Sequence, residues 1–354
     1  MFLFDFYNQM CFISRLLSPI TGNGKRAPDP PVDLPSETLR RRRTERGLMK
    51  KILVLYYSQS GQLTRIVNQV VKPIRRIPEI AIVSEALHPE PPYPFPWSAV
   101  QFCDVFPESV AGTPCRLRPP VNNLDDDYDL IILAYTVWYL APSIPVNSFL
   151  QSPEAARLFR DRPVVTVVGC RNMWLLAQER VKRIVTDLGG RIAGNIVLGD
   201  RTNNLVGVLT IAVWMLTGRK ERFLKVFPLP GISEDDIEAA ERFGKPIASS
   251  LAAETFALDQ NELNELGALH VQPSLLLMEK RISRVFAIWS RFIRQKGGPG
   301  SPNRRKRVRA FMVYLIVAVI VLAPLASVAA AVWKVLKKEK LRAEIEYHSQ
   351  NALR

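Results

Sequence analysis

The chain has 354 residues, and 47% of them are hydrophobic, which is enough to build a core and excludes a generally disordered protein. Its net charge of +15 is unevenly spread, since residues 1–49 contribute +3, residues 50–303 contribute +4 and residues 304–354 contribute +8. More than half of the excess therefore flanks one apolar segment, which indicates a membrane surface and argues against nucleic acid as a partner. The four cysteines form no Cys-x-x-Cys pair, which fits a reduced cytosolic compartment.

Residues 1–48 are predicted to be a flexible extension of the folded domain. The stretch from Met1 to Leu17 is apolar, but charged and polar residues interrupt it, and it lacks the order of a signal peptide. Met49 stands immediately before the first predicted strand. We therefore expect Met49 as an alternative start of the chain.

The stretch 50–64 is predicted to form a strand, a loop and the beginning of a helix. Residues 52–57 are an apolar run typical of a strand buried on both faces, and from Leu63 onward apolar residues recur every three or four positions. The loop offers hydroxyl groups, a glycine and the free N–H groups of a helix N-terminus, from Ser58, Gln59, Ser60, Gly61, Gln62, Leu63 and Thr64. This chemistry suits a phosphate, and the simpler alternative is an N-capped helix after a buried strand.

Further strands are predicted at 80–87, 128–135, 163–170 and 191–198, with helices at 146–159 and 173–188. Strands that alternate with helices predict an α/β fold in which helices cover both faces of a parallel sheet. The helix predicted at 233–253, with Ser233 as its cap, would close this domain.

The loop 58–64 resembles the phosphate loop of flavodoxins, a Ser/Thr-x-Ser/Thr-Gly-x-x-Ser/Thr pattern after the first strand that binds the phosphate of FMN. No Walker motif and no Gly-x-Gly-x-x-Gly motif occurs there. The resemblance implies FMN as the cofactor and a flavodoxin-like, doubly wound, five-stranded parallel sheet of order 2-1-3-4-5. It also implies FMN at the switch point between strands 1 and 3.

Two further loops are expected to meet FMN at this switch point. The loop after the third strand contains Thr136, Val137, Trp138 and Tyr139, and it resembles the aromatic loop of flavodoxin-like quinone reductases. Trp138 or Tyr139 would stack on the flavin ring, unless the two aromatic residues only cap the core. The loop after the fourth strand contains Gly169, Cys170, Arg171 and Asn172. There Gly169 would permit close approach between the backbone and the flavin, and Arg171 and Asn172 would bind the pyrimidine edge of the flavin.

Two insertions are expected within the FMN domain, which we place at 49–253. Residues 89–120 are rich in proline and aromatic residues and predict an ordered apolar loop, which either walls a hydrophobic substrate channel or fills space over the helices. Residues 201–230 contain the apolar run 205–217. At about 20 Å this run is too short to span a bilayer, so we expect a buried or surface-docked helix.

The motifs at 57–64, 169–174, 203–207 and 214–218 together resemble flavodoxin-like proteins commonly named dialkylresorcinol condensing enzymes, over about residues 49–245. The resemblance implies an FMN-dependent oxidoreductase that aromatises a cyclic dione, beside a ketosynthase-like partner enzyme. A condensation needs a nucleophile, usually Cys, with basic partners, and no Cys/His constellation is recognisable around His88, His270 and His348. The alternatives are an electron-transfer or quinone-reducing flavoprotein and a binding module that has lost FMN.

The C-terminal part predicts membrane attachment. Residues 254–303 form a helical region in which 275–293 is amphipathic and would lie along the membrane, followed by a Gly/Pro hinge at 297–302. Residues 310–333 carry no charge and predict one transmembrane helix within the segment 304–336, before a basic tail at 337–354. The positive-inside rule weighs eight basic residues before this helix against five after it. It predicts a cytoplasmic FMN domain and a tail across the membrane.

Overall fold

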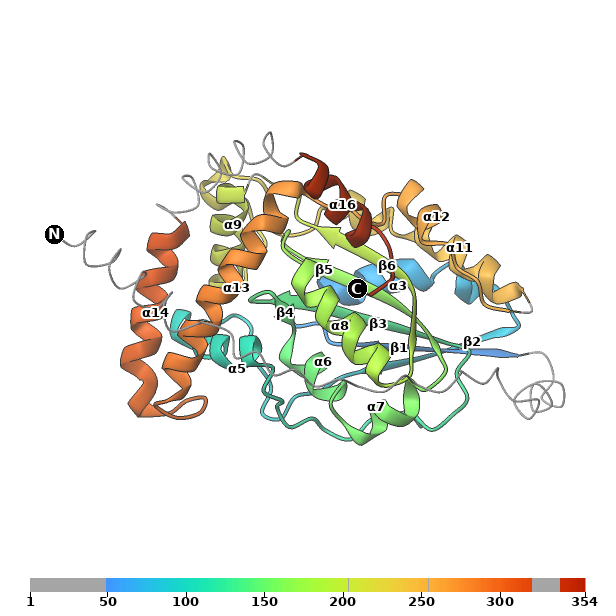
Figure 1. The fold of residues 1–354 in the computed structure, drawn as a ribbon, viewed down its shortest axis with the longest axis horizontal. Helices are drawn as coiled ribbons and strands as arrows, with labels where there is room; N and C mark the ends of the chain where they lie inside the picture. Colours follow the sequence, from blue (N-terminus) through green and yellow to red (C-terminus); the bar gives the residue numbers. More distant parts are fainter. Residues whose placement is uncertain (1–48, 203, 254, 320–337, 354) are drawn as a thin grey trace. The chain divides into compact units, whose positions relative to one another are not determined.

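The computed structural model describes residues 49–202, 204–253, 255–319 and 338–353 (Figure 1). The predicted extension 1–48 lies outside the described residues. Strands β1 (Lys50–Tyr56), β2 (Ile80–Ala86), β3 (Leu130–Trp138), β5 (Pro163–Cys170) and β6 (Arg191–Gly199) pair in the order β2-β1-β3-β5-β6. All four of these pairings are parallel, which confirms the predicted flavodoxin-like strand order. The short strand β4 (Ala141–Pro142) pairs antiparallel with the end of β3.

The register places the carboxyl ends of three strands at one edge of the sheet. Tyr56 on β1 lies opposite Ala134 on β3, and Thr136 on β3 lies opposite Gly169 on β5. Because β2 and β3 flank β1 on opposite sides, the chain reverses its direction of winding beside β1. This edge is therefore the topological switch point.

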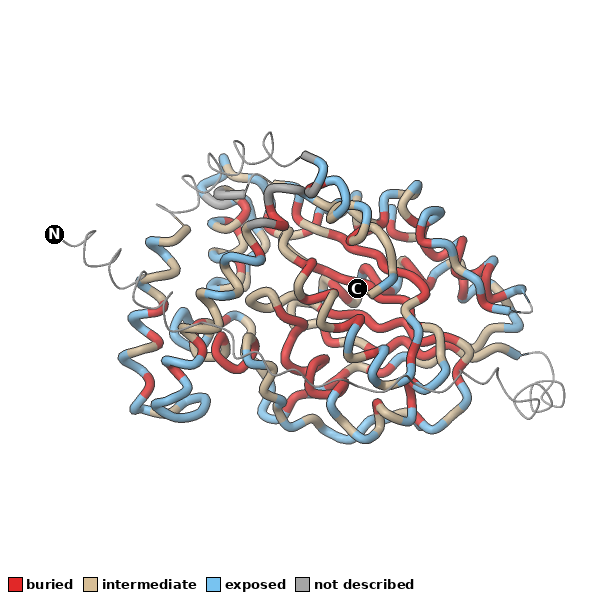
Figure 2. Tube along the Cα trace, viewed as in Figure 1, coloured by how far each residue is buried: buried red, intermediate tan, exposed pale blue. Residues whose placement is uncertain are grey.

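Helices cover both faces of the sheet. Side chains at alternate strand positions point to opposite faces, so Ile52 and Val54 face one core and Leu53 and Leu55 face the other. The first core contains residues of α3 (Gln62–Val71), α10 (Glu234–Glu238), α11 (Glu241–Ala252) and α12 (Gln260–Glu265). The second contains residues of α6 (Ile144–Phe149), α7 (Pro153–Leu158) and α8 (Leu175–Asp187). Strands β1, β3, β5 and β6 are buried along most of their length, as the red segments of Figure 2 show.

Two helices predicted as continuous are each divided. Residues 146–159 form α6 and α7, because Pro153 begins a new helix and the Ser152 hydroxyl caps it by accepting the N–H of Ala155. Residues 233–253 form α10 and α11, and the predicted cap Ser233 accepts the N–H of Asp236 at 3.1 Å. The short 3₁₀ helix η1 (Ile74–Arg76) follows α3.

The insertion 89–120 contains regular structure, so the prediction of a loop there is wrong. Helix α4 (Ala99–Asp104) begins with a capping box formed by Ser98 and Gln101, and α5 (Phe106–Ala111) has Pro107 in its first turn. The prolines therefore limit helix length without preventing helix formation. The second insertion contains α9 (Asn204–Thr217), as predicted, and the 3₁₀ helix η2 (Phe223–Lys225).

The C-terminal part consists of α13 (Pro273–Arg294), η3 (Pro302–Arg304), α14 (Arg305–Val317) and α16 (Lys338–His348). Among the described residues, no helix is both long enough and apolar enough to cross a membrane. Residues 320–337, which include much of the predicted span 310–333, lie outside the described residues. Arg304 does not lie on an exposed basic flank, because its side chain is fully buried and pairs with Asp104 and Glu108.

Candidate functional site

The phosphate loop, residues 58–64, turns sharply from β1 into α3. Gly61 has φ +79°, a conformation that favours glycine, and a Cβ atom built on it would meet nothing within 4 Å. The Ser58 hydroxyl accepts the N–H of Thr64 at 3.2 Å and closes the loop. Within the described part of the chain, the N–H groups of Gln62 and Leu63 donate to no protein acceptor. The helix therefore presents free N–H groups beside open space, which is the arrangement that binds phosphate.

The side chains of this loop mostly hold it in place. The Gln59 amide donates to the carbonyl of Pro94 at 2.8 Å, which joins the loop to the first insertion. The Gln62 side chain bonds both backbone groups of Ile232, with distances of 3.0 and 3.2 Å. Leu63 is buried in the core, so only its backbone faces the loop. Ser60 and Thr64 are half-buried, and their hydroxyl groups complete the predicted set.

An aromatic cluster of Tyr57, Tyr93, Trp97 and Trp138 lies beside the phosphate loop. The Trp138 ring meets those of Tyr57, Tyr93 and Trp97 edge to face, at centroid distances of 5.9, 5.1 and 5.9 Å. Tyr57 is the residue directly before the loop, and Tyr93 and Trp97 belong to the first insertion. The insertion therefore brings its aromatic residues to the switch point, close to where a flavin ring was expected.

Two buried polar atoms near this cluster have no hydrogen-bond partner among the described residues. They are the indole nitrogen of Trp97 and the hydroxyl oxygen of Thr136. Buried polar groups in proteins are nearly always paired, so this unpaired donor and hydroxyl lie where a ligand or an ordered water supplies the missing bond. Thr136 was predicted to contact the cofactor, whereas Trp97 was predicted only as part of the insertion.

The second insertion packs against the first one above the loop. The backbone N–H of Trp97 donates to the carbonyl of Met215 on α9 at 2.8 Å, and the Phe95 and Trp214 rings meet edge to face at 6.1 Å. Glu234 on α10 pairs with Arg65 on α3 and with Lys220 at the end of this insertion, and both hold the pKa of its carboxyl down to about 2. The two insertions thus form one wall of the candidate site.

Tyr139 does not join the aromatic cluster. Its hydroxyl donates to the carbonyl of Phe102 at 2.7 Å, and its ring packs on Phe106 and Phe286. Burial raises the pKa of this hydroxyl well above its usual value. Val137 is held by strand pairing with Pro142. Of the two aromatic residues predicted to stack on the flavin, Trp138 is therefore the one that lies at the site.

The end of β5 and the two residues after it divide between packing and polar roles. A Cβ atom on Gly169 would lie 3.3 Å from the Leu63 side chain, so this glycine allows α3 to pack closely on the sheet. Arg171 donates to the side-chain oxygen of Asn172 at 2.8 Å. Burial lowers the pKa of Arg171, and the nearby carboxylate of Asp200 opposes this shift. Arg171, Asn172 and Asp200 together form the polar edge of the site.

The two tyrosines of the aromatic cluster and the nearby Cys170 thiol stay protonated and uncharged at physiological pH. Burial raises the pKa values of Tyr57, Tyr93 and the Cys170 thiol well above their ordinary values. The structure thus provides an uncharged aromatic surface next to a phosphate-binding helix end, and this combination fits a flat ring carrying a phosphate, such as FMN. Sequence reasoning missed Tyr57, Tyr93 and Asp200, although each lies within or next to a strand end or a predicted insertion.

No family model and no curated protein matches this chain. Solved structures with a similar arrangement include a flavoprotein in complex with FMN from Lactobacillus acidophilus NCFM, with 19% identity over 43% of this chain and 93% of that chain, and a TM-score of 0.34. A flavodoxin from the domain Archaea has 12% identity over 57% of this chain and 99% of that chain, with a TM-score of 0.32. Oxidised flavodoxin 1 from Bacillus cereus has 13% identity over 55% and 95%, with a TM-score of 0.29. Because these scores are low, the fold assignment depends on the strand order and the parallel register alone.

Proposed function

We propose that this protein is an FMN-dependent oxidoreductase that acts on an apolar, quinone-like ring. The observation that carries the proposal is the position of the phosphate loop, which has open space at Gly61 and lies directly beside four clustered aromatic side chains. The neighbouring ends of β1 and β3 would bind a phosphate at the start of α3 and a flat ring near Trp138. This is the geometry that the switch point of an open α/β sheet provides.

The residues of the site would bind and orient FMN and exclude water from it. The N–H groups of Gln62 and Leu63 would hold the phosphate, and Trp138 would border the ring. The unpaired indole N–H of Trp97 and the Thr136 hydroxyl would hydrogen-bond polar atoms of the ring or of the substrate. Bound FMN supplies reversible acceptance of two electrons, so the protein itself needs no redox-active group.

Cys103 and Cys170 do not favour a condensing enzyme. Burial raises the pKa of Cys103 to about 11, with the neighbouring Asp104 adding to the shift, and it raises that of Cys170 still further. A thiol with such a pKa is almost entirely protonated at neutral pH, whereas the thiolate is the nucleophile. Among the described residues, no histidine forms a hydrogen bond with a cysteine, so neither thiol has the base that activates a catalytic Cys.

Our finer proposal is the aromatisation of a cyclic dione in dialkylresorcinol biosynthesis, in which the dione loses two electrons and two protons to become a resorcinol. A ketosynthase-like partner enzyme would form the carbon–carbon bond beforehand. The alternative is a quinone-reducing or electron-transfer flavoprotein, which the same uncharged site would serve. A binding module without FMN is a third possibility, and the open space at Gly61 weighs against it.

Two measurements separate these functions. Absorbance in the flavin bands after mild purification, or after incubation with FMN, tests whether the cofactor binds, and a folded protein that takes up no FMN would overturn the proposal. Turnover of a dialkylcyclohexanedione, compared with reduction of a simple benzoquinone, then separates the aromatising function from quinone reduction. FMN binding with only quinone turnover would support the alternative.

A further inference from the structure

The C-terminal helix α16 packs on the α/β domain. Leu341 is buried in the core that α8 shares with the sheet, and Ile345 packs against the same core. Lys280 on α13 pairs with Glu344 at 3.0 Å. The residues after α16 continue these contacts, since the carbonyl of Ser349 accepts from the Asn264 amide at 2.9 Å. The end of the chain is therefore part of the folded domain.

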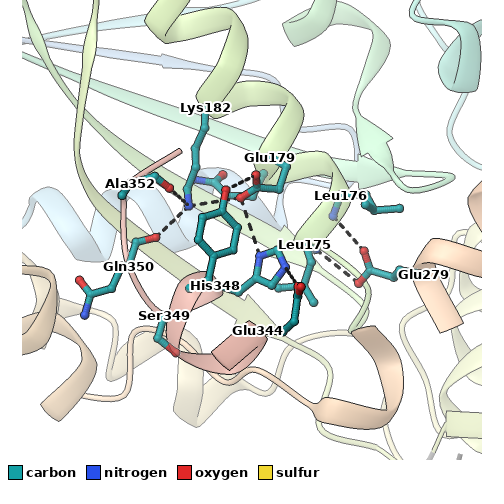
Figure 3. Close-up of polar contacts among 12 residues, drawn as sticks. Leu175, Leu176, Glu179, Lys182, Glu279, Glu344, His348, Ser349, Gln350 and Ala352 are labelled. Atoms are coloured by element: carbon teal, nitrogen blue, oxygen red, sulfur yellow. Dashed lines mark hydrogen bonds and ion pairs between the residues drawn. The ribbon is translucent and has the colours of Figure 1, made fainter. Parts of the chain in front are cut away.

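A buried cation fixes this contact (Figure 3). The Lys182 side chain on α8 is only 2% exposed, and its ammonium donates to the carbonyls of Gln350 at 2.8 Å and Ala352 at 3.4 Å. Glu179, one turn earlier, pairs with Lys182 at 3.3 Å and accepts the hydroxyl of Tyr347 at 2.7 Å. Because burial of an ammonium is costly without such partners, the position of Lys182 depends on the docked tail.

The start of the apolar stretch 310–333 is also docked on the domain. The Phe311 ring stacks on Phe106 of the first insertion with the centroids 3.8 Å apart, and Val308 is buried beside it. The opposite face of α14 is exposed and apolar, with 57% exposure at Val313, 53% at Ile316 and 47% at Val317. Arg305, Lys306 and Arg309 are exposed at the beginning of the same helix. This face is apolar next to a basic end, as in helices that lie on anionic membranes.

The contacts made before and after the apolar stretch 310–333 limit how the chain can be placed across a membrane. A single helix over the 24 residues of 310–333 would be about 36 Å long, and it would place its two ends on opposite sides of a hydrocarbon core about 30 Å thick. Residues 304–311 and 341–352, however, both contact the same α/β domain. A tail on the far side of a membrane would be unable to make the contacts of Lys182, Glu179 and Lys280.

We infer that this protein binds an anionic lipid bilayer from one side only, through the exposed face of α14, and that its C-terminal tail stays on the same side as the α/β domain. This proposal differs from the predicted arrangement, in which the tail lies across the membrane. The inference does not depend on the proposed FMN function. A lipid surface fits this face because its exposed apolar side chains continue into an uncharged sequence and lie beside exposed arginines.

Cysteine labelling tests the topology. The full chain carrying either Ala352→Cys in the tail or Glu265→Cys on the exposed part of α12 is expressed in bacteria, and right-side-out and everted membrane vesicles are treated with a membrane-impermeant maleimide. We expect both cysteines to react in the same preparation and to be protected in the other, after subtraction of the signal from the unsubstituted chain. Reaction of the two cysteines in opposite preparations would overturn the inference, and so would absence of the protein from the membrane fraction.

Vesicle binding tests the surface. The purified full chain is sedimented with vesicles of phosphatidylcholine and phosphatidylglycerol in equal parts. The double variant Val313→Ser/Ile316→Ser should reduce the bound fraction at least fivefold, because the apolar face of α14 is lost. The matched control is Val121→Ser, since Val121 is 86% exposed far from α14 in the sequence. Equal binding of the double variant and the control would contradict the assigned surface, and flavin content provides a separate readout of the FMN site.

Discussion

The phosphate loop and the C-terminal helices are held in the protein by different kinds of contact. The loop 58–64 uses backbone groups and neutral side chains of consecutive residues. The helices α13, α14 and α16 are each attached by a buried ionisable side chain, namely Glu279, Arg304 and Lys182, and each partner lies about a hundred residues or more away. An apolar helix face packs on many surfaces, whereas a buried ionisable group needs one particular partner. These three side chains therefore select where the helices dock.

The largest expected effect comes from the attachment of α14. Arg304 is fully buried between Asp104 at 2.7 Å and Glu108 at 2.8 Å. Arg304→Ala leaves both carboxylates without this partner, so we expect a loss of about 3–5 kcal/mol in the free energy of unfolding, measured by urea denaturation. The FMN affinity of the protein that remains folded should stay within about twofold, because the loop is held by contacts with Pro94 and Ile232, which do not belong to α14.

The neighbouring Arg305→Ala provides the control, since Arg305 is exposed and its replacement should change stability by less than about 0.5 kcal/mol. Equal effects of the two substitutions would show that the buried pair does not hold α14. A large loss of FMN affinity in Arg304→Ala alone would instead show that the two regions are coupled.

The sequence predicted the sheet much better than these attachments. Apolar runs such as 52–57 and 163–170 identify buried strands directly, because every residue of such a strand faces a core. Arg304, by contrast, stands within a run of basic residues and was assigned to an exposed flank. Its partners lie 196 and 200 positions earlier in the chain, and no local pattern indicates such a pairing.

The next effect concerns α13 and depends on pH. Glu279 is buried, and its carboxylate accepts the N–H groups of Leu175 and Leu176 at the start of α8. Burial raises the pKa of this carboxyl to about 7 from 4.5, against the opposing effect of the N–H groups. Between pH 4.5 and 7 the folded protein holds a proton on Glu279 that the unfolded chain has released. The contribution of Glu279 to the free energy of unfolding is therefore complete below pH 4.5 and is lost as the pH rises through 7. The loss is on the order of 3 kcal/mol.

Urea unfolding at pH 5 and pH 8 measures this contribution. Glu279→Gln keeps an acceptor for the N–H groups of α8 but does not titrate, so the difference in stability between the two pH values should shrink by most of that amount. The control is Glu265→Gln on the exposed part of α12, which should leave the pH dependence unchanged. The same pH dependence in Glu279→Gln as in the parent would contradict the assignment.

For the candidate site, the sequence predicted the local motif and missed the wall around it. Residues 58–64 are consecutive, so their order alone indicates a phosphate loop. Tyr93 and Trp97 reach Trp138 only because the insertion folds back over the strand end, with Gln59 bonded to Pro94. The same folding removes Tyr139 from the site, because the insertion offers its hydroxyl an acceptor at Phe102.

Substitutions at Gly61 should affect FMN binding more than stability, which is the reverse of Arg304→Ala. Gly61→Val places a branched side chain in the open space and forces a φ of +79° on a β-branched residue, which costs about 1–2 kcal/mol. We expect at least a tenfold loss of FMN affinity, measured by fluorescence titration of the apoprotein. Gly61→Asn separates the two causes, because Asn tolerates positive φ and should restore stability but still obstruct the phosphate. Unchanged affinity in both folded variants would exclude the loop as the phosphate site.

The smallest effects distinguish the two adjacent aromatic residues. Tyr139→Phe removes only the hydrogen bond to Phe102, so it should cost about 1 kcal/mol of stability and leave flavin fluorescence unchanged. Trp138→Leu removes the ring that meets Tyr57, Tyr93 and Trp97, so we expect a change in flavin fluorescence and reduction potential in the protein loaded with FMN. Flavin spectra that respond to Tyr139→Phe and not to Trp138→Leu would reverse the assignment. Tyr139 would then border the ring, and the cluster around Trp138 would be part of the core.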